Sequence, residues 1–179
     1  MAGIDRFRRG MHPSAAAAVV ATAVWVTIAF SAVPSMAAAR EETINLVSRA
    51  SLLLPSSQLP GVAWSGNANL YTPDGAPAGT ATGGCIITKV SGASGVPAAT
   101  SHCNIQFALA LPDGRVGDVH TSAVMVTSLG PPSKIEYAIN GGTKDFRNAA
   151  GDATSTLTSA VVPGNPTEWI LTFRLTTIE

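Results

Sequence analysis

The segment 139–151 constrains the fold more than any other part of the chain, because it reads as the end of a strand, a glycine pair, a polar loop and a new strand. Alternating apolar residues from Ile135 to Ile139 predict the first strand. The pair Gly141-Gly142 supplies backbone conformations with positive φ that residues carrying a Cβ resist. Phe146 follows as an apolar anchor before a Thr-rich segment begins. This pattern predicts a strand–loop–strand corner of an all-β fold.

The first 39 residues are expected to be a secretory signal peptide and not part of the fold. Three arginines between positions 6 and 9 precede an apolar run over 15–30, and Ala37 and Ala39 are the small residues that a signal peptidase requires. The run is shorter than the roughly 20 residues of a membrane-spanning helix. A twin-arginine route is the weaker alternative, because the residues after Arg9 lack the rest of that pattern. We expect cleavage after Ala39, secretion, and no membrane association of the mature chain.

The charge of the expected mature chain argues against a nucleic-acid partner. Removing Arg6, Arg8, Arg9 and Asp5 with the signal peptide leaves eight basic and ten acidic residues, a net charge of −2. No basic stripe interleaved with aromatic residues remains. The remaining 140 residues suit one domain. We place a lead-in at 40–60 and a β-barrel domain at 61–179.

Strand signals dominate the mature chain. Alternating apolar and polar residues predict strands over 62–71, 80–90, 100–111 and 167–178, separated by turn clusters. On the last of these, Trp169, Leu171 and Phe173 share one face. The segment 40–58 is ambiguous between a short helix, an edge strand and a disordered lead-in. About seven antiparallel strands with short turns predict either a closed barrel or a sandwich.

The best-defined hairpin spans 103–126. Its turn, Leu111-Pro-Asp-Gly-Arg115, fits a three-residue loop with Gly114 in the left-handed conformation. That loop sets a register in which Gln106 faces His120 and the apolar side chains share the other face. A shift by one residue would mix the two faces, which favours this loop.

Cys85 and Cys103 are the two cysteines of the chain. If the loop at 91–97 closes a hairpin near Ser94, they lie directly opposite each other, so a cross-strand disulfide is geometrically reasonable. Export favours the disulfide over the alternative, a reactive or metal-binding thiol pair. Cysteines on neighbouring strands also favour a barrel, because an immunoglobulin-type sandwich sets its cysteines on opposed sheets.

The glycine corner resembles the signature Gly-Gly-Thr-Gly-x-Phe-x-x-Ala-Arg-Gly of the dirigent and allene oxide cyclase barrel proteins. Matching positions run from Gly141 through Phe146 to Gly151, and turns at Pro73-Asp-Gly and Leu111-Pro-Asp-Gly add to the likeness. The resemblance covers about residues 62–178. It implies an eight-stranded antiparallel up-and-down β-barrel with an apolar cavity, usually assembled as a homotrimer. It further implies cofactor-free isomerase or cyclase chemistry, or the steering of radical coupling.

The chain departs from these patterns at two places. Ala150 stands where the signature has arginine. The first predicted strand offers Ser65, Asn67, Asn69 and Tyr71, where the plant cyclase has a glutamate. Neither plant activity is therefore carried over by matching residues.

A candidate acid–base group lies on one strand face. His120, beside Asp118 and opposite Gln106, combines a titratable imidazole with a carboxylate and an amide. These three residues are the catalytic candidates if that face points into the lumen. The outward interpretation is favoured, because polar strand faces of soluble barrels usually contact water.

A hollow barrel would be lined by aromatic side chains. The candidate cavity residues are Trp64, Tyr71, Phe107, Tyr137 and Phe173, although packing into a solid core is the simplest role for such residues. Asp145 and Arg147 of the glycine corner are expected to bond the loop locally. Two mature histidines and a disulfide do not form an ordinary zinc site, and no nucleotide-binding or hydrolase motif is present. We therefore expect no metal and no cofactor.

Two functions fit this sequence. One is a secreted isomerase or cyclase whose cavity holds a small hydrophobic molecule in a reactive conformation. The alternative is a non-catalytic binder of such molecules. A third, a structural or surface protein, predicts a lumen filled by side chains.

Overall fold

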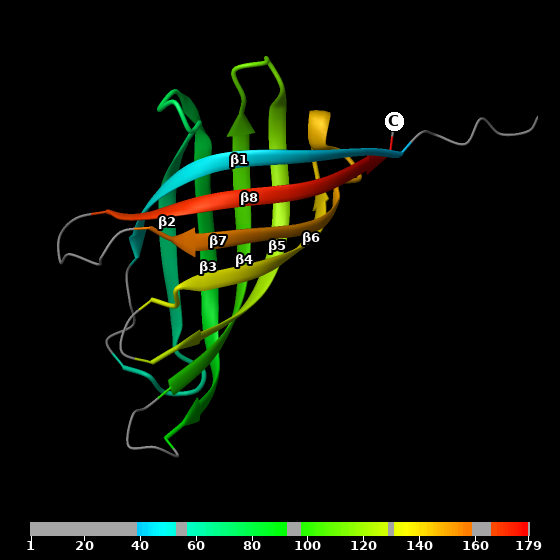
Figure 1. Ribbon diagram of the computed structural model, residues 1–179. Coiled ribbons are helices and arrows are strands. Elements are labelled where there is room, and N and C mark those ends of the chain that lie inside the picture. The colour runs from blue at the N-terminus through cyan, green and yellow to red at the C-terminus, as the bar shows by residue number, and fades with distance from the viewer. Residues whose placement is uncertain (1–38, 53–56, 93–97, 129–130, 159–165, 179) are drawn as a thin grey trace, which may run out of the picture. The chain divides into compact units, whose positions relative to one another are not determined.

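The structure, a computed structural model, describes residues 39–52, 57–92, 98–128, 131–158 and 166–178. Each strand pairs antiparallel with the next, and β8 pairs with β1, so the sheet closes into the predicted eight-stranded up-and-down barrel (Figure 1). Closure removes the exposed strand edges of an open sheet. The strands are β1 (Ala39–Leu52), β2 (Ala63–Tyr71), β3 (Pro77–Ser91), β4 (Ala98–Ala110), β5 (Val116–Thr127), β6 (Lys134–Gly142), β7 (Ala150–Leu157) and β8 (Thr167–Ile178).

β1 corrects the prediction for the start of the domain. The segment 40–60, expected to be a lead-in, contains most of a strand that pairs with β8 from Ala39↔Ile178 to Ala50↔Thr167. Its inward face carries Ile44, Leu46 and Ser48. A buried serine interrupts the apolar alternation, which explains why the sequence pattern was ambiguous here. Without this strand the barrel would not close.

The hairpin of β4 and β5 has the predicted register. Gln106 pairs with His120, and Phe107 pairs with Val119. The backbone N–H of Leu111 donates to the carbonyl of Arg115 at 2.9 Å, and Gly114 adopts φ of +92°. A residue with a Cβ would be strained in this conformation, which explains the glycine.

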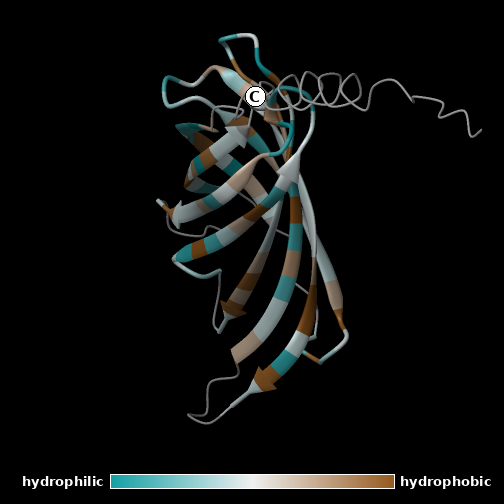
Figure 2. Ribbon diagram, turned by 90° about the vertical axis from the view of Figure 1, so that its right-hand side faces the viewer, coloured by the Kyte–Doolittle hydropathy of each residue, from teal (hydrophilic) through white to brown (hydrophobic). Residues whose placement is uncertain are grey.

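Apolar and polar residues alternate along the strands (Figure 2). The inward positions form a single buried cluster, and the outward positions are mostly polar. Among the described residues, no helix is long and apolar enough to cross a membrane.

The glycine corner closes one end of the barrel. β6 ends at Gly142, a 3₁₀ turn η1 (Lys144–Phe146) follows, and the side chain of Phe146 is fully buried. Gly141 has φ of +145°, as the glycine pair predicted. Gly142 has a different role, because a Cβ there would collide with the carbonyl oxygens of Phe146 and Asp118. The backbones of β5 and the corner approach each other too closely for any side chain.

Two side chains hold this corner to β5. The carboxylate of Asp145 accepts a hydrogen bond from the backbone N–H of Val116 at 2.8 Å. Thr143 accepts one from the N–H of Asp118 at 3.0 Å and donates to that residue's carboxylate at 3.1 Å. Asp145 therefore bonds the backbone of β5 and not its own loop, which corrects the expectation of a local bond.

Candidate ligand cavity

A row of inward-facing residues crosses all eight strands, each residue pairing with the next across neighbouring strands. Its smallest members are Ala123 and Ala153. Edge-to-face contacts join Phe107 to Tyr137 and Phe173, with ring centroids 5.9 Å and 5.0 Å apart. In strand order, starting from β2, the row consists of Trp64, Cys85, Cys103, Ala123, Tyr137, Ala153, Phe173 and Ile44.

A cavity of about 80 Å³ lies beside this row, and Trp64, Cys85 and Tyr137 line it. Met125, near the end of β5, and Ile135, near the start of β6, line it, whereas Phe146 follows the end of β6. The cavity and the Phe146 plug therefore lie toward opposite ends of the barrel. None of the described residues that line the cavity is Asp, Glu, Lys, Arg or His. It consists of Ser48, Ala50, Trp64, Gly66, Asn67, Ala68, Ala81, Thr82, Gly83, Cys85, Ile105, Phe107, Met125, Ile135, Tyr137, Ser155 and Trp169.

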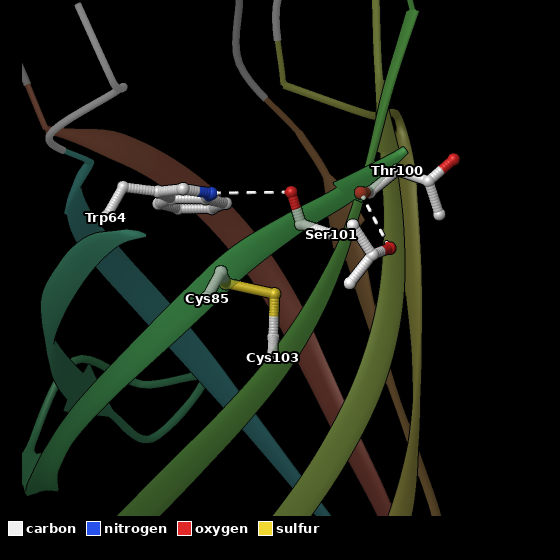
Figure 3. Close-up of a disulfide and its surroundings, with 6 residues drawn as sticks. Trp64, Cys85, Thr100, Ser101 and Cys103 are labelled. Carbon is white, nitrogen blue, oxygen red and sulfur yellow. Dashed lines mark hydrogen bonds between the residues drawn. A yellow bond between two sulfur atoms is a disulfide. The ribbon is translucent and has the colours of Figure 1, made fainter. Parts of the chain in front are cut away.

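The predicted disulfide forms part of this wall. Cys85 and Cys103 pair directly across β3 and β4, with Cα atoms 4.0 Å apart, and are bonded. Figure 3 shows Trp64 reaching from β2 to Ser101 on β4, beside the bridge; its indole N–H donates to the Ser101 hydroxyl at 3.4 Å. The disulfide and this hydrogen bond fix the wall formed by β2, β3 and β4.

Tyr137 is the ionisable side chain of the cavity. It is 6% exposed, and its hydroxyl donates to Ser155 at 3.2 Å. Burial raises the pKa of Tyr137, an effect partly offset by the hydrogen bond with Ser155. The phenol is therefore neutral at physiological pH, and its single O–H must turn away from Ser155 to donate a hydrogen bond to a bound molecule. The Ser48 hydroxyl also lines the cavity.

Alkaline pH is expected to destabilise the fold through Tyr137. In the unfolded chain the phenol ionises near pH 10, whereas the raised pKa keeps it neutral in the folded protein. The stabilisation is thus complete below pH ~10 and is lost as pH rises toward the folded-state pKa. Urea unfolding between pH 8 and 11 measures this loss. Tyr137→Phe should reduce the alkaline slope, whereas Tyr71→Phe should keep it; equal slopes in all three proteins would contradict this role.

The proposed acid–base group lies on the outer face of the barrel. His120 and Gln106 are exposed and pair across β4 and β5, beside an outer hollow of about 580 Å³. Asp118 bonds Thr143 of the glycine corner. The outward interpretation of this face is the one that the structure shows, so these side chains do not reach the lumen.

The aromatic candidates divide into three groups. Trp64, Phe107 and Tyr137 line the cavity. Phe173 is fully buried against Phe107, within the core. Tyr71 corrects the prediction: it lies on the outer face, where the Arg49 guanidinium lies 4.8 Å from its ring centroid. Alternation along β2 already places it opposite Trp64.

Sequence reasoning missed several cavity residues. Ser48 lies in the ambiguous β1, and Ser155 lies in a strand whose two faces are both small and polar. Trp169 was not missed in the same way, because it shares the apolar face that a hollow barrel turns toward its cavity. The hydrogen bond from Tyr137 to Ser155 depends on the β6–β7 register, which no turn signal in the sequence fixed.

A larger hollow of about 860 Å³ lies on the outer face, over β4 to β8. Ion pairs lie along it, with Lys134 2.6 Å from Glu136 and Arg174 2.9 Å from Asp152. The lumen cavity is the better small-molecule site, because it is apolar and surrounded by the barrel wall. Within the described ranges, no three His, Cys, Asp or Glu side chains are grouped to hold a metal ion.

Comparison with known proteins identifies the fold. No protein-family model and no curated protein matches the chain. The solved structure of the pterocarpan synthase dirigent protein GePTS1 matches with a TM-score of 0.58 and 13% identity, over 98% of this chain and 100% of that one. For the pterocarpan synthase dirigent protein PsPTS1 the values are 0.51 and 14%, over 79% and 96%. A pyocyanin demethylase matches with a TM-score of 0.47 and 22% identity, over 73% and 99%. The chain therefore has a dirigent-like barrel fold, as its glycine corner predicted.

Proposed function

We propose that this protein is a secreted barrel that binds a small, largely apolar molecule in its lumen. The observation that carries the proposal is the cavity of about 80 Å³, walled by aromatic and aliphatic side chains around one neutral phenol. A purely structural barrel would have its lumen filled by side chains. Export remains part of the proposal, and an N-terminus at Arg40 in the protein recovered from culture medium would support it.

The size of the cavity limits the ligand. A water molecule needs about 10–15 Å³ of such a cavity. The cavity of about 80 Å³ therefore has room for several water molecules. That space suits one small ring or a short branched chain. Larger ligands would have to insert one end alone.

The polar groups of the cavity define the ligand's chemistry. The O–H of Tyr137, which donates to Ser155, can be redirected to a ligand, and the hydroxyls of Ser48 and Ser155 lie in the same lining. A charged ligand would lose its hydration without gaining a counter-charge there. We infer that the ligand is neutral and carries one hydrogen-bond acceptor, such as a carbonyl or ether oxygen.

Filling the cavity is expected to abolish binding. Ala68 lines the cavity, and its neighbour Asn69 is exposed on the outer face. Ala68→Phe should weaken binding of acetophenone, a neutral ring with one carbonyl, by at least about tenfold, because its ring occupies the same space. Asn69→Phe, the matched control, should bind like the wild type. Calorimetric titration measures both; equal affinities in the two variants would place the binding site elsewhere.

Removing the hydroxyl of Tyr137 should change which ligands the cavity prefers while leaving the shape of the cavity nearly unchanged. Isopropylbenzene resembles acetophenone but lacks the carbonyl oxygen. The ratio of acetophenone to isopropylbenzene affinity should fall about threefold to tenfold in Tyr137→Phe, because one neutral hydrogen bond contributes about 0.5–1.5 kcal/mol. Titrations with both compounds give this ratio. An unchanged ratio would remove Tyr137 from ligand recognition.

A cofactor-free isomerase or cyclase is the second candidate. The fold shared with the pterocarpan synthase dirigent proteins favours it, and positioning a flexible substrate requires few charged groups. Because His120 lies outside the lumen, catalysis would depend on the cavity. Turnover of an unsaturated epoxide that survives His120→Ala but not Ala68→Phe would support this function; loss in His120→Ala alone would restore the acid–base hypothesis.

A further inference from the structure

The disulfide has a second property besides cross-linking β3 and β4: it belongs to the wall of the ligand cavity. Cys85 is among the cavity-lining residues. Cys85 is 5% exposed and Cys103 is 1% exposed. Both point inward, in the same row of paired residues as Trp64 and Tyr137. A disulfide that served only as a staple would be equally effective on the outer face.

We propose that the Cys85–Cys103 disulfide is a ligand-contacting part of the cavity, so that the bound molecule shields the bridge from thiol reductants and the oxidised protein binds more tightly than the reduced one. This inference rests on the proposed function of the lumen. Ligand binding in the lumen would then depend on whether Cys85 and Cys103 are bonded or reduced.

Access to the bridge is the first argument. β3 and β4 pair without interruption around it, from Gly79↔Leu109 to Ile87↔Ser101, so the ladder covers its outer side. Cys103 is also among the residues at the outer hollow, but it is only 1% exposed, so we infer that a small thiol reaches the bridge through the cavity, at Cys85. In the reaction, a thiolate attacks one sulfur and forms a mixed disulfide, and a second thiolate then releases it. The two cysteines gain two electrons and two protons, and the reductant leaves as a disulfide.

Space is the second argument. Two thiols that are no longer bonded must separate to van der Waals contact. On one side Trp64 is fixed by its hydrogen bond to Ser101, so the separating sulfur of Cys85 moves toward the cavity. Reduction should thus shrink or reshape the space for a ligand. If reduction lowers the ligand affinity by some factor, linkage requires that bound ligand shift the equilibrium between dithiol and disulfide toward the disulfide by the same factor.

The experiment measures reduction by dithiothreitol in the presence and absence of saturating acetophenone, with the free thiols alkylated and counted by mass spectrometry. We expect reduction at least about tenfold slower with the probe. Ala68→Phe should be reduced slowly even without it, because its ring blocks the cavity. The rate should not rise at urea concentrations below the unfolding transition, since a rise would show reduction through unfolding. Acetophenone should not change the reduction of oxidised glutathione.

The affinity of the reduced protein completes the test. In dithiothreitol, acetophenone should bind the wild type at least about threefold more weakly than it binds the oxidised protein. Suppose that calorimetry shows binding, but acetophenone does not slow reduction and the reduced protein binds it as tightly as the oxidised protein. This inference is then wrong and the proposed function stands. If acetophenone and isopropylbenzene do not bind the oxidised protein, the proposed function fails, and the inference fails with it.

Discussion

Phe146→Ala is expected to lower the free energy of unfolding by about 3–5 kcal/mol, the range for removing a fully buried aromatic side chain. Phe146 is 0% exposed and fills the barrel end beside the glycine corner. The Arg115 guanidinium lies 5.7 Å from its ring centroid. The loss combines the transfer of the ring to water with a cavity that the closed sheet cannot collapse to fill. Urea unfolding with the disulfide intact measures it.

Leu59→Ala provides the control for this substitution. Leu59 is also a large apolar residue but is 63% exposed, so its truncation should change stability by less than about 0.5 kcal/mol. Phe146→Leu, which keeps most of the volume, should lie between the two. A loss below about 1 kcal/mol in Phe146→Ala would show that the ring does not plug the barrel as described.

Gly142→Ala has the second largest expected effect, a loss of at least about 2–3 kcal/mol for a single methyl group. The added Cβ would lie against the carbonyl oxygen of Phe146 and 2.5 Å from that of Asp118. Both neighbours are backbone atoms held by hydrogen bonds, including that from the Thr143 N–H to Asp118 at 2.9 Å. The corner must therefore move away from β5 to accept the methyl group.

Gly84→Ala is the matched control within the same barrel. Its added Cβ would find as nearest neighbour the carbonyl oxygen of Trp64 at 3.8 Å, an ordinary contact. Alanine also has less conformational freedom to lose on folding, so this variant should be neutral or slightly more stable than the wild type. Similar losses in both variants would mean that close approach is not what requires glycine at position 142.

Much of the fold could be predicted from local chemistry. The turn at Pro112-Asp-Gly set the β4–β5 register because one loop length alone separates the apolar and polar faces. The strand 167–178 was predicted with the bounds that it has, because four large apolar residues alternate along it. β1 stayed open between a helix, an edge strand and a disordered lead-in, because the buried Ser48 hides its alternation. Its role comes from pairing with β8, more than a hundred residues away in the chain.

The candidate site was harder to predict than the fold. Alternation placed Trp64, Phe107 and Tyr137 on inward faces, but whether they filled the lumen or lined a cavity depended on the small residues opposite them. Ala50, Ala68 and Ala81 leave that space, and they lie side by side only through the registers of β1, β2 and β3. Pairings of this kind are set by closure of the whole sheet, which no local pattern specifies.

The location of a bound molecule tests the central claim most directly. Nuclear Overhauser effects between acetophenone and the isotope-labelled oxidised protein report which side chains the probe contacts. We predict contacts to the rings of Tyr137 and Phe107 and to the methyl group of Ala68, inside the lumen. Contacts to Val124 and Ala138 in the outer hollow instead, or no contacts at millimolar probe, would contradict the assignment of the lumen as the binding site.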